Sequence, residues 1–186
     1  MKNSVRGFPP VVETARLLIR PNDPATAEVV NAAVRASFKE LHEWMPWAER
    51  LPPVEITRKH LTESQEQYHA GTDCGLGLWL KDSGAFVGAS GLHPRPADPM
   101  WREIGYWVHT AHAGRGLATE AVLGIVETGF ALGLAGIELK ASERNVASHR
   151  VAERAGFVRE AILDDGRLDP GGHPSRTVLF VRRNAT

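Results

Sequence analysis

The sequence Glu103-Ile-Gly-Tyr-Trp-Val-His-Thr-Ala-His-Ala-Gly-Arg-Gly-Leu-Ala-Thr119 carries a strand-like segment through a Gly-Arg-Gly turn directly into an amphipathic helix. The glycines of the turn leave backbone N–H groups accessible, with no side chain beside them. The first helical turn adds N–H groups without intrahelical partners and the positive end of the helix dipole. The pattern therefore predicts a binding site for an anionic group where this helix begins.

The Gly-Arg-Gly turn alone does not identify the ligand. A P-loop ends in Gly-Lys-Ser/Thr, and a dinucleotide-binding turn needs a further glycine where Thr119 stands. The residues present exclude both of these classes. A tight turn that binds nothing is the alternative interpretation of Gly114 and Gly116.

Length and composition favour one domain of balanced charge. The 186 residues are 42% hydrophobic and 24% charged, which suits a single core. Lys plus Arg and Asp plus Glu each number 22, so no excess positive charge would attract nucleic acid or an anionic membrane. We therefore expect one domain over residues 1–186, with its core at about 13–182, and neither nucleic acid nor membrane as a partner.

Several features favour a cytoplasmic location. Residues 1–10 contain no apolar segment of the kind that a secretory signal requires. Cys74 is the single cysteine, so no internal disulfide forms, and its alternating surroundings predict a small core residue rather than a reactive thiol. The most apolar stretch, 117–137, includes Glu120 and Glu127, which favours a buried helix over a membrane span.

Apolar spacing in the first half predicts both helices and strands. The second helix is expected to end at Gly71 and to bury Ile56, Leu61 and Tyr68. The expected elements are a strand over 14–20, a helix over 24–38, a break at 44–47, a helix over 54–69, and a hairpin of strands 76–81 and 85–93.

In the second half, helices alternate with strands. We expect a strand over 102–109, a helix over 118–132, a strand over 137–141, a helix over 145–155 ended by Gly156, and strands over 157–163 and 177–182 around a loop at 164–175. This order predicts a mixed α/β (α+β) sheet with helices on both faces.

Further motifs follow the Gly-Arg-Gly helix, namely Asn145-Val-Ala-Ser148 and Glu153-Arg-Ala-Gly-Phe157. With them the chain resembles the Gcn5-related N-acetyltransferase (GNAT) superfamily, and most closely its RimJ/RimL-type branch. The run from Ala113 to Ala118 matches the acyl-CoA signature Gln/Arg-x-x-Gly-x-Gly/Ala, with Ala113 in place of Gln or Arg. Residues 103–108, 119–121 and 13–20 resemble that branch in particular. The resemblance covers about 13–182 and implies a single domain with a mostly antiparallel sheet.

Acetyl-CoA is the co-substrate that the resemblance implies. The backbone of Trp107 and Val108 would pair with the pantetheine arm, as an added strand pairs with an exposed sheet edge. Because the first signature position acts mainly through its backbone, Ala113 is expected to alter the phosphate contacts only slightly. The pyrophosphate would be held by the amides of Gly114, Arg115, Gly116, Leu117, Ala118 and Thr119.

Asn145 and Ser148 lie three residues apart, so a helix presents both on one face. By the resemblance, Asn145 contacts the pantetheine amides. The alternative is a helix N-cap, for which Asn is a preferred residue, and both roles can hold. The branch places a serine at position 148 to serve the thiolate leaving group, whereas a solvent-facing helix serine is the alternative.

Glu103 is the candidate general base. The acceptor amine must be neutral to attack the thioester carbonyl, while an ammonium group with a pKa of about 10 is mostly charged at neutral pH. Glu103 precedes the cofactor-binding strand, so it can take up the proton directly or through a water. An exposed strand carboxylate, or an ion pair with Arg102 or Arg115, is the alternative. A backbone N–H near Val108 would polarise the carbonyl.

The acceptor side is expected in the first half of the chain, where relatives of this fold build it. Trp44 and Trp47 are candidates to bind the acceptor, although two tryptophans beside a proline can also form a corner of the core. His149 and His173 have no further ligands at metal spacing, so we expect no metal.

The resemblance implies an N-acetyltransferase that transfers acetyl from acetyl-CoA to a primary amine in a ternary complex. The α-amino group of a protein N-terminus, of the ribosomal-protein type, is the first acceptor expected. Polyamines, amino acids and aminoglycosides stay open, because a fold does not fix its acceptor. An acyl-CoA-binding sensor without chemistry is the alternative from another class, and the presence of both Glu103 and Ser148 argues against it. A homodimer is compatible with the branch.

Overall fold

The computed structural model describes residues 7–166, 168 and 174–185. Within them, eight strands form one sheet in the order β1-β2-β3-β4-β5-β6-β8-β7. Neighbouring strands are antiparallel except β5 and β6, which are parallel, so the expected mixed and mostly antiparallel sheet is confirmed. The strands are β1 (Val12–Glu13), β2 (Leu17–Pro21), β3 (Cys74–Leu80), β4 (Phe86–Pro94), β5 (Trp101–Val108), β6 (Gly136–Ser142), β7 (Val158–Leu163) and β8 (Thr177–Arg183).

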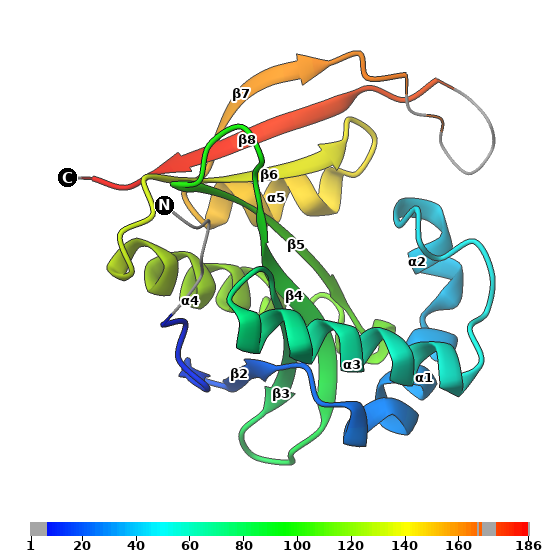
Figure 1. The fold of residues 1–186 in the computed structure, drawn as a ribbon. Helices are drawn as coiled ribbons and strands as arrows, with labels where there is room; N and C mark the ends of the chain where they lie inside the picture. The colour runs from blue at the N-terminus through cyan, green and yellow to red at the C-terminus, as the bar shows by residue number, and fades with distance from the viewer. Residues whose placement is uncertain (1–6, 167, 169–173, 186) are drawn as a thin grey trace.

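Helices cover both faces of this sheet, as expected. Figure 1 shows α3 in front of the strands with α1 beside it, and α4 and α5 on the other side. The helices are α1 (Ala27–Ala36), α2 (Phe38–Trp44), α3 (Val54–Ala70), α4 (Leu117–Ala131) and α5 (Val146–Arg154). None of the helices in the described part of the chain is long and apolar enough to cross a membrane.

Two hydrophobic clusters fill the spaces between helices and sheet. The larger one joins α4 and α5 to the sheet and includes Leu76, Ile104, Ile125 and Phe157. The smaller one joins α1, α2 and α3 to Trp79 and neighbouring residues on the opposite face. Both clusters depend on the alternation of side chains along each strand.

Cys74 belongs to the larger cluster, where it is fully buried. Burial raises the pKa of its thiol to about 12, so the reactive thiolate is scarce at neutral pH. The expectation of a core cysteine is confirmed.

The helix expected over 24 to roughly 38 is confirmed as α1, which ends at Ala36, but the separate helix α2 that begins at Phe38 was not predicted. The junction is Ser37, whose buried hydroxyl accepts a hydrogen bond from the Thr110 N–H at 3.0 Å. This bond fixes the chain where the helix axis changes. The short α2 buries Leu41, and apolar spacing over so few residues gives little signal.

Helix α3 ends at Gly71 in the left-handed conformation (φ 68°), which confirms the predicted C-terminus. Its buried face contains Thr57, Leu61 and Ser64. The expectation that Ile56 is buried is wrong, since it is 56% exposed on another side of the helix. The loop predicted at 164–175 lies partly outside the described residues.

Strands β5 and β6 pair only where they begin. Their parallel register joins Trp101 with Gly136, Arg102 with Ile137, and Glu103 with Glu138. Beyond these pairs β5 continues along β4 and β6 continues along β8, so the two parts of the sheet diverge toward α2 (Figure 1). Within the described residues, the edge of β5 that faces β6 is therefore unpaired over its second half.

Gly88 on β4 allows β5 to approach closely. It has a φ of 151°, and a Cβ atom there would lie 2.2 Å from the Trp107 carbonyl oxygen. A side chain would push β5 away at the point where its other edge becomes free.

We expect Gly88→Ala to destabilise the protein by about 3 kcal/mol, through backbone strain and collision with β5. The matched control is Gly84→Ala, since Gly84 also has a positive φ (68°) but a Cβ atom there would meet nothing within 4 Å. The control should cost about 1 kcal/mol, measured by urea unfolding. Equal losses at the two glycines would contradict the close approach.

Candidate active site

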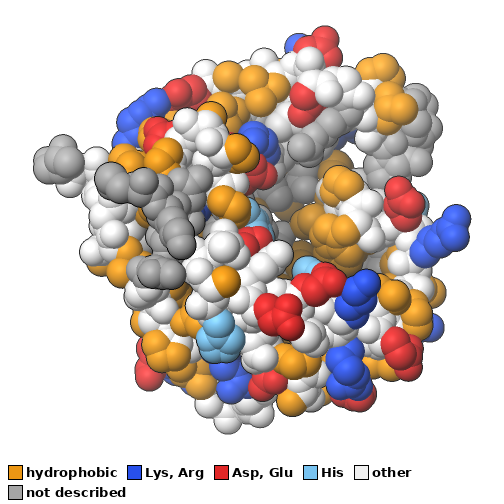
Figure 2. All heavy atoms as spheres, viewed as in Figure 1, with side chains coloured by type: hydrophobic (Ala, Val, Ile, Leu, Met, Phe, Trp, Pro, Cys, Tyr) orange, Lys and Arg blue, Asp and Glu red, His pale blue; other side chains and the backbone are white. Residues whose placement is uncertain are grey.

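A cavity of about 550 Å³ lies where β5 and β6 diverge. Its walls come from the diverging strands, from α2 and the loop after it, and from the start of α5. Figure 2 shows this face hollowed toward α2. The lining includes the predicted site residues Trp44, Glu103, Asn145 and Ser148, together with Met45, Tyr106, Lys140, Ser142 and Thr177.

The Gly-Arg-Gly turn opens α4 as the sequence predicts. Gly114 and Gly116 have φ values of 75° and 77°, and Gly116 is the N-cap of the helix. Positive φ is cheap only for glycine, so this turn requires both residues. The turn is exposed, and the first N–H groups of α4, from Leu117 onward, have no intrahelical acceptors. Its geometry fits a phosphate group.

The N-terminal segment fastens this turn. Glu120 accepts hydrogen bonds from the Thr14 hydroxyl, from the Arg16 backbone N–H and from the Arg16 guanidinium, each at 2.6 Å. Arg16 also donates to the Arg115 carbonyl oxygen at 3.0 Å. Burial alone would raise the pKa of Glu120, but the hydrogen bonds from Thr14 and Arg16 outweigh it and lower the pKa. An ionised Glu120 therefore holds residues 14–16 against the turn.

Trp107 and Val108 lie in the half of β5 whose edge toward β6 is free. Val108 pairs with Gly88 on the β4 side. Their remaining backbone groups can accept an extended ligand as an additional strand. The site therefore fits the pantetheine arm of acetyl-CoA as well as its phosphates.

Asn145 and Ser148 stand at the start of α5. The Asn145 side chain accepts a hydrogen bond from the Ser148 N–H at 3.0 Å, so its predicted role as an N-cap is confirmed. The cap fixes the first turn of α5, and both residues line the cavity. Ser148 is half-buried, so it is not a freely solvated helix serine.

Glu103 ion-pairs with Lys140 on β6 at 2.7 Å. The alternative expectation of an ion pair is therefore confirmed, but its partner is Lys140 and not Arg102 or Arg115. Arg102 is buried and donates to the Pro99 and Trp101 carbonyl oxygens. Sequence spacing did not reveal Lys140, because the parallel register of β5 and β6 creates the contact.

Lys140 also pairs with Glu138, which lies opposite Glu103 in the parallel register. Glu138 is 2% exposed and has a second cation, Arg95, at 2.9 Å. Burial by itself lowers the pKa of Lys140, but its hydrogen bonds to Glu103 and Glu138 outweigh burial and raise the pKa. A charged Lys140 thus holds two carboxylates that would otherwise repel each other.

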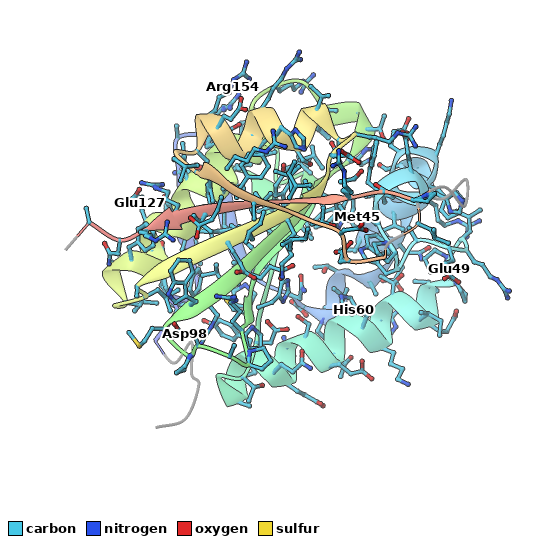
Figure 3. All side chains as sticks on the ribbon, turned by 90° about the horizontal axis from the view of Figure 1, so that it is seen from above. Met45, Glu49, His60, Asp98, Glu127 and Arg154 are labelled. Carbon is cyan, nitrogen blue, oxygen red and sulfur yellow. The ribbon has the colours of Figure 1, made fainter. Side chains whose placement is uncertain are left out.

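Helix α2 and the loop after it form the outer wall. Figure 3 shows Met45 on the side toward the strands and Glu49 farther out in the loop. Trp44 lines the cavity, whereas Trp47 is 53% exposed and packs against Trp107 with ring centroids 6.4 Å apart. The structure thus separates the two predicted tryptophans.

The described residues contain no group of three or more His, Cys, Asp or Glu able to hold a metal ion. His149 is hydrogen-bonded to the Ser142 carbonyl oxygen at 3.0 Å and lies against the ring of Phe180. His173 lies outside the described residues.

An anion-binding helix start beside a strand with a free edge is the arrangement expected of an enzyme that uses acetyl-CoA. The acetyltransferase (GNAT) domain matches residues 16–158, and the chain belongs to this family. A Bacillus subtilis (strain 168) protein named "Probable N-acetyltransferase YjcK" is 31% identical over 150 residues, which are 78% of this chain and 82% of that protein. The chain is therefore an acetyl-CoA-dependent N-acetyltransferase.

Solved structures support the same fold. The ribosomal L7/L12 α-N-protein acetyltransferase RimL in complex with coenzyme A superposes with a TM-score of 0.83 at 18% identity, covering 93% of this chain and 97% of RimL. The ribosomal-protein-S5-alanine acetyltransferase from Vibrio fischeri gives a TM-score of 0.83 at 18% identity, covering 94% and 96%. Both neighbours therefore share the fold of this chain.

We expect Lys140→Met to destabilise the fold by about 2 kcal/mol, because it leaves Glu138 and Glu103 facing each other, with partial exposure reducing the penalty. Lys59→Met is the matched control, since Lys59 pairs with Glu63 at 3.8 Å on an exposed helix face. Its loss should stay below about 0.5 kcal/mol. Urea unfolding of both variants measures the difference.

The raised pKa of Lys140 fixes the sign of the pH dependence. Its stabilisation is fully present below the unfolded-state pKa of about 10.4 and is lost as pH rises through the higher folded-state value. The gap between wild type and Lys140→Met should therefore be full at about pH 7 and shrink only above about pH 10.4. A gap that closes between about pH 7 and that pH would contradict the network.

Proposed function

We propose that the protein acetylates the α-amino group of a protein N-terminus, by direct attack of the amine on acetyl-CoA in a ternary complex. One observation carries the catalytic part: Glu103 on β5 and Ser148 on α5 line the same cavity, at the point where β5 acquires a free edge. A base and a group that serves the leaving thiolate are the two that this reaction uses.

Consecutive elements of the chain, β5 and the turn before α4, bind consecutive parts of the cofactor. The free edge of β5 at Trp107 and Val108 takes the pantetheine arm, with Asn145 close to its amides across the cavity. The turn from Gly114 to Thr119 takes the pyrophosphate through backbone N–H groups and the dipole of α4. The Arg16 guanidinium, which donates to the Arg115 carbonyl oxygen in this turn, adds positive charge beside it.

Glu103 removes the amine proton directly or through a water, and Lys140 fixes the orientation of its carboxylate. The N–H near Val108 stabilises the oxyanion that forms on the thioester carbonyl. The hydroxyl of Ser148 donates a hydrogen bond to the departing thiolate. A thiol pKa of about 8.5 makes this thiolate a fair leaving group, so Ser148 accelerates the step without being essential.

The strength of the base and the charge of the cavity both favour an α-amino acceptor. An α-amino group has a pKa of about 8, so an appreciable fraction of it is neutral near neutral pH and little is required of a carboxylate that is already paired with a lysine. A polyamine ammonium with a pKa of about 10 is almost fully charged and would need a stronger base. Among the described residues, the Asp, Glu, Lys and Arg side chains that line the cavity are Glu43, Glu49, Glu103 and Lys140, an acidic excess that attracts an ammonium group.

The activities for which the structural neighbours are named favour the same acceptor. RimL is named as an α-N-protein acetyltransferase of ribosomal L7/L12, and the Vibrio fischeri protein as an acetyltransferase of an alanine of ribosomal protein S5. We assign Trp44 to the wall that contacts the acceptor. Trp47 lies outside the cavity lining and packs against the ring of Trp107.

We expect Arg16→Ala to raise the dissociation constant for coenzyme A about tenfold, or about 1.4 kcal/mol, because the turn loses an anchor and the pyrophosphate loses a nearby charge. Arg183→Ala is the matched control: the two arginines are similarly exposed, at 50% and 54%, and Arg183 pairs with Glu160 on β7. Calorimetry should show the control within about twofold of wild type. Equal affinities for all three proteins would refute a role of the Arg16–Glu120 contact in coenzyme A binding.

The function itself is tested by release of free thiol from acetyl-CoA, with peptides, polyamines, aminoglycosides and amino acids as acceptors. We expect release with N-terminal peptides, lowered at least about tenfold in kcat by Ser148→Ala and by Glu103→Gln. Ser83→Ala and Glu160→Gln, outside the cavity, should leave the rate unchanged.

Release with a small amine alone would replace the proposed acceptor. Tight binding of acetyl-CoA, without any amine-dependent release and without effect of the two variants, would support the sensor instead.

A further inference from the structure

Tyr106 is a buried polar residue that the roles assigned above leave unused. Its hydroxyl oxygen is inaccessible and has no hydrogen-bond partner among the described residues. Such a group costs free energy unless it finds a partner in the working state of the protein. Tyr106 also lines the cavity, one residue before Trp107. An unpartnered donor in this position points to a contact that forms only when the site is in use.

The position of Tyr106 on β5 brings it to α5. Side chains alternate along the strand, so Tyr106 shares a face with Ile104, and both join the cluster beneath α4 and α5. Glu103 lies on the opposite face, with Lys140. Tyr106 and Glu103 therefore meet the cavity from different faces of the same strand.

Ser148 is the neighbouring polar group on α5. Burial raises the pKa of Tyr106 to about 12, and the Ser148 hydroxyl opposes that rise in part. The two hydroxyls are thus close, although they do not meet the geometry of a hydrogen bond. Catalytic hydrogen bonds are commonly loose in a free enzyme and tighten around the substrate. At neutral pH Tyr106 keeps its proton and can act as a donor.

Among the described residues, no hydrogen bond fixes the direction of the Ser148 hydroxyl. The Asn145 cap holds the backbone N–H of Ser148, which fixes the turn of helix but leaves the hydroxyl free to rotate. A rotating hydroxyl offers its single proton to the sulfur only part of the time. A donor that occupies a lone pair of the serine oxygen restricts the proton to the remaining directions, of which the cavity is one.

We propose that Tyr106 is a positioning residue that donates a hydrogen bond to the Ser148 oxygen and thereby directs the serine proton at the thioester sulfur. This inference rests on the role proposed for Ser148. The bond formed in the step joins the amine nitrogen to the carbonyl carbon, and the bond broken is carbon to sulfur. The proton removed from the amine balances the thiolate that leaves. Tyr106 keeps its own proton throughout.

The test is Tyr106→Phe, which removes only the hydroxyl, made in the wild-type and in the Ser148→Ala background. We expect kcat to fall about fivefold in the wild-type background, with KM for acetyl-CoA within about twofold. In the Ser148→Ala background the same change should have no further effect, since the two residues act as a unit.

Tyr68→Phe is the matched control. Tyr68 is the other of the two tyrosines in the chain, and its hydroxyl donates to the Phe8 carbonyl oxygen at 2.7 Å, at a distance from the cavity. Its loss should leave kcat unchanged in both backgrounds. A fall in kcat for Tyr106→Phe that is equal in both backgrounds, or no fall at all, would overturn the inference.

A second measurement does not depend on turnover. With two tyrosines, the Cζ resonance of isotope-labelled Tyr106 is assigned by comparison with Tyr68→Phe. We expect that resonance to move on Ser148→Ala in the protein saturated with coenzyme A, while that of Tyr68 stays in place. An unmoved Tyr106 resonance would overturn the inference even if the enzyme is active. A moved resonance in a protein that acetylates none of the amines would support it and refute the proposed function alone.

Discussion

Everything in the site depends on how little of β5 and β6 is paired. Three residues of each strand share hydrogen bonds, and in the last of these pairs two carboxylates, Glu103 and Glu138, stand opposite each other. Such a pair is unfavourable unless a cation lies between the carboxylates, and Lys140 supplies it. The Lys140 ammonium group therefore allows β5 and β6 to pair at this point. Past it, the strands are free to separate, and the separation creates both the cavity and the free edge of β5.

Local patterns in the sequence predicted most of the architecture. Strands β2 to β8, the helices α3, α4 and α5, and the glycine at the end of α3 follow from residues close to one another in the chain. The turn before α4 followed from glycines that alone adopt positive φ cheaply. Likewise, Asn145 was predicted as a cap, because that role needs only its own helix. Where a residue acts on its immediate neighbours, its type and spacing are sufficient.

The sequence did not predict the contacts made across the sheet. The pairing of Lys140 with Glu103 depends on the parallel register of β5 and β6. The position of Tyr106 near α5 depends on which face of β5 that helix covers. Neither the register of two strands nor the face that a helix covers can be read from residue spacing within one element. The division into α1 and α2 was missed because Ser37 is held by Thr110, distant in sequence. Trp44 and Trp47 look equivalent in the sequence, yet one lines the cavity and the other supports Trp107.

The hydrogen bonds between Arg16 and Glu120 affect the order in which the protein folds. Its hydrogen bonds join residues 104 positions apart, so they form only after most of the chain is present. Contacts of such separation carry a large cost in loop entropy and tend to form late in folding. The turn that we propose to bind the pyrophosphate thus takes its final shape only when residues 14–16 dock beside α4. If the proposed role of this turn holds, a nascent chain acquires its affinity for coenzyme A only after residues 14–16 have docked, so cofactor binding would follow the completion of folding.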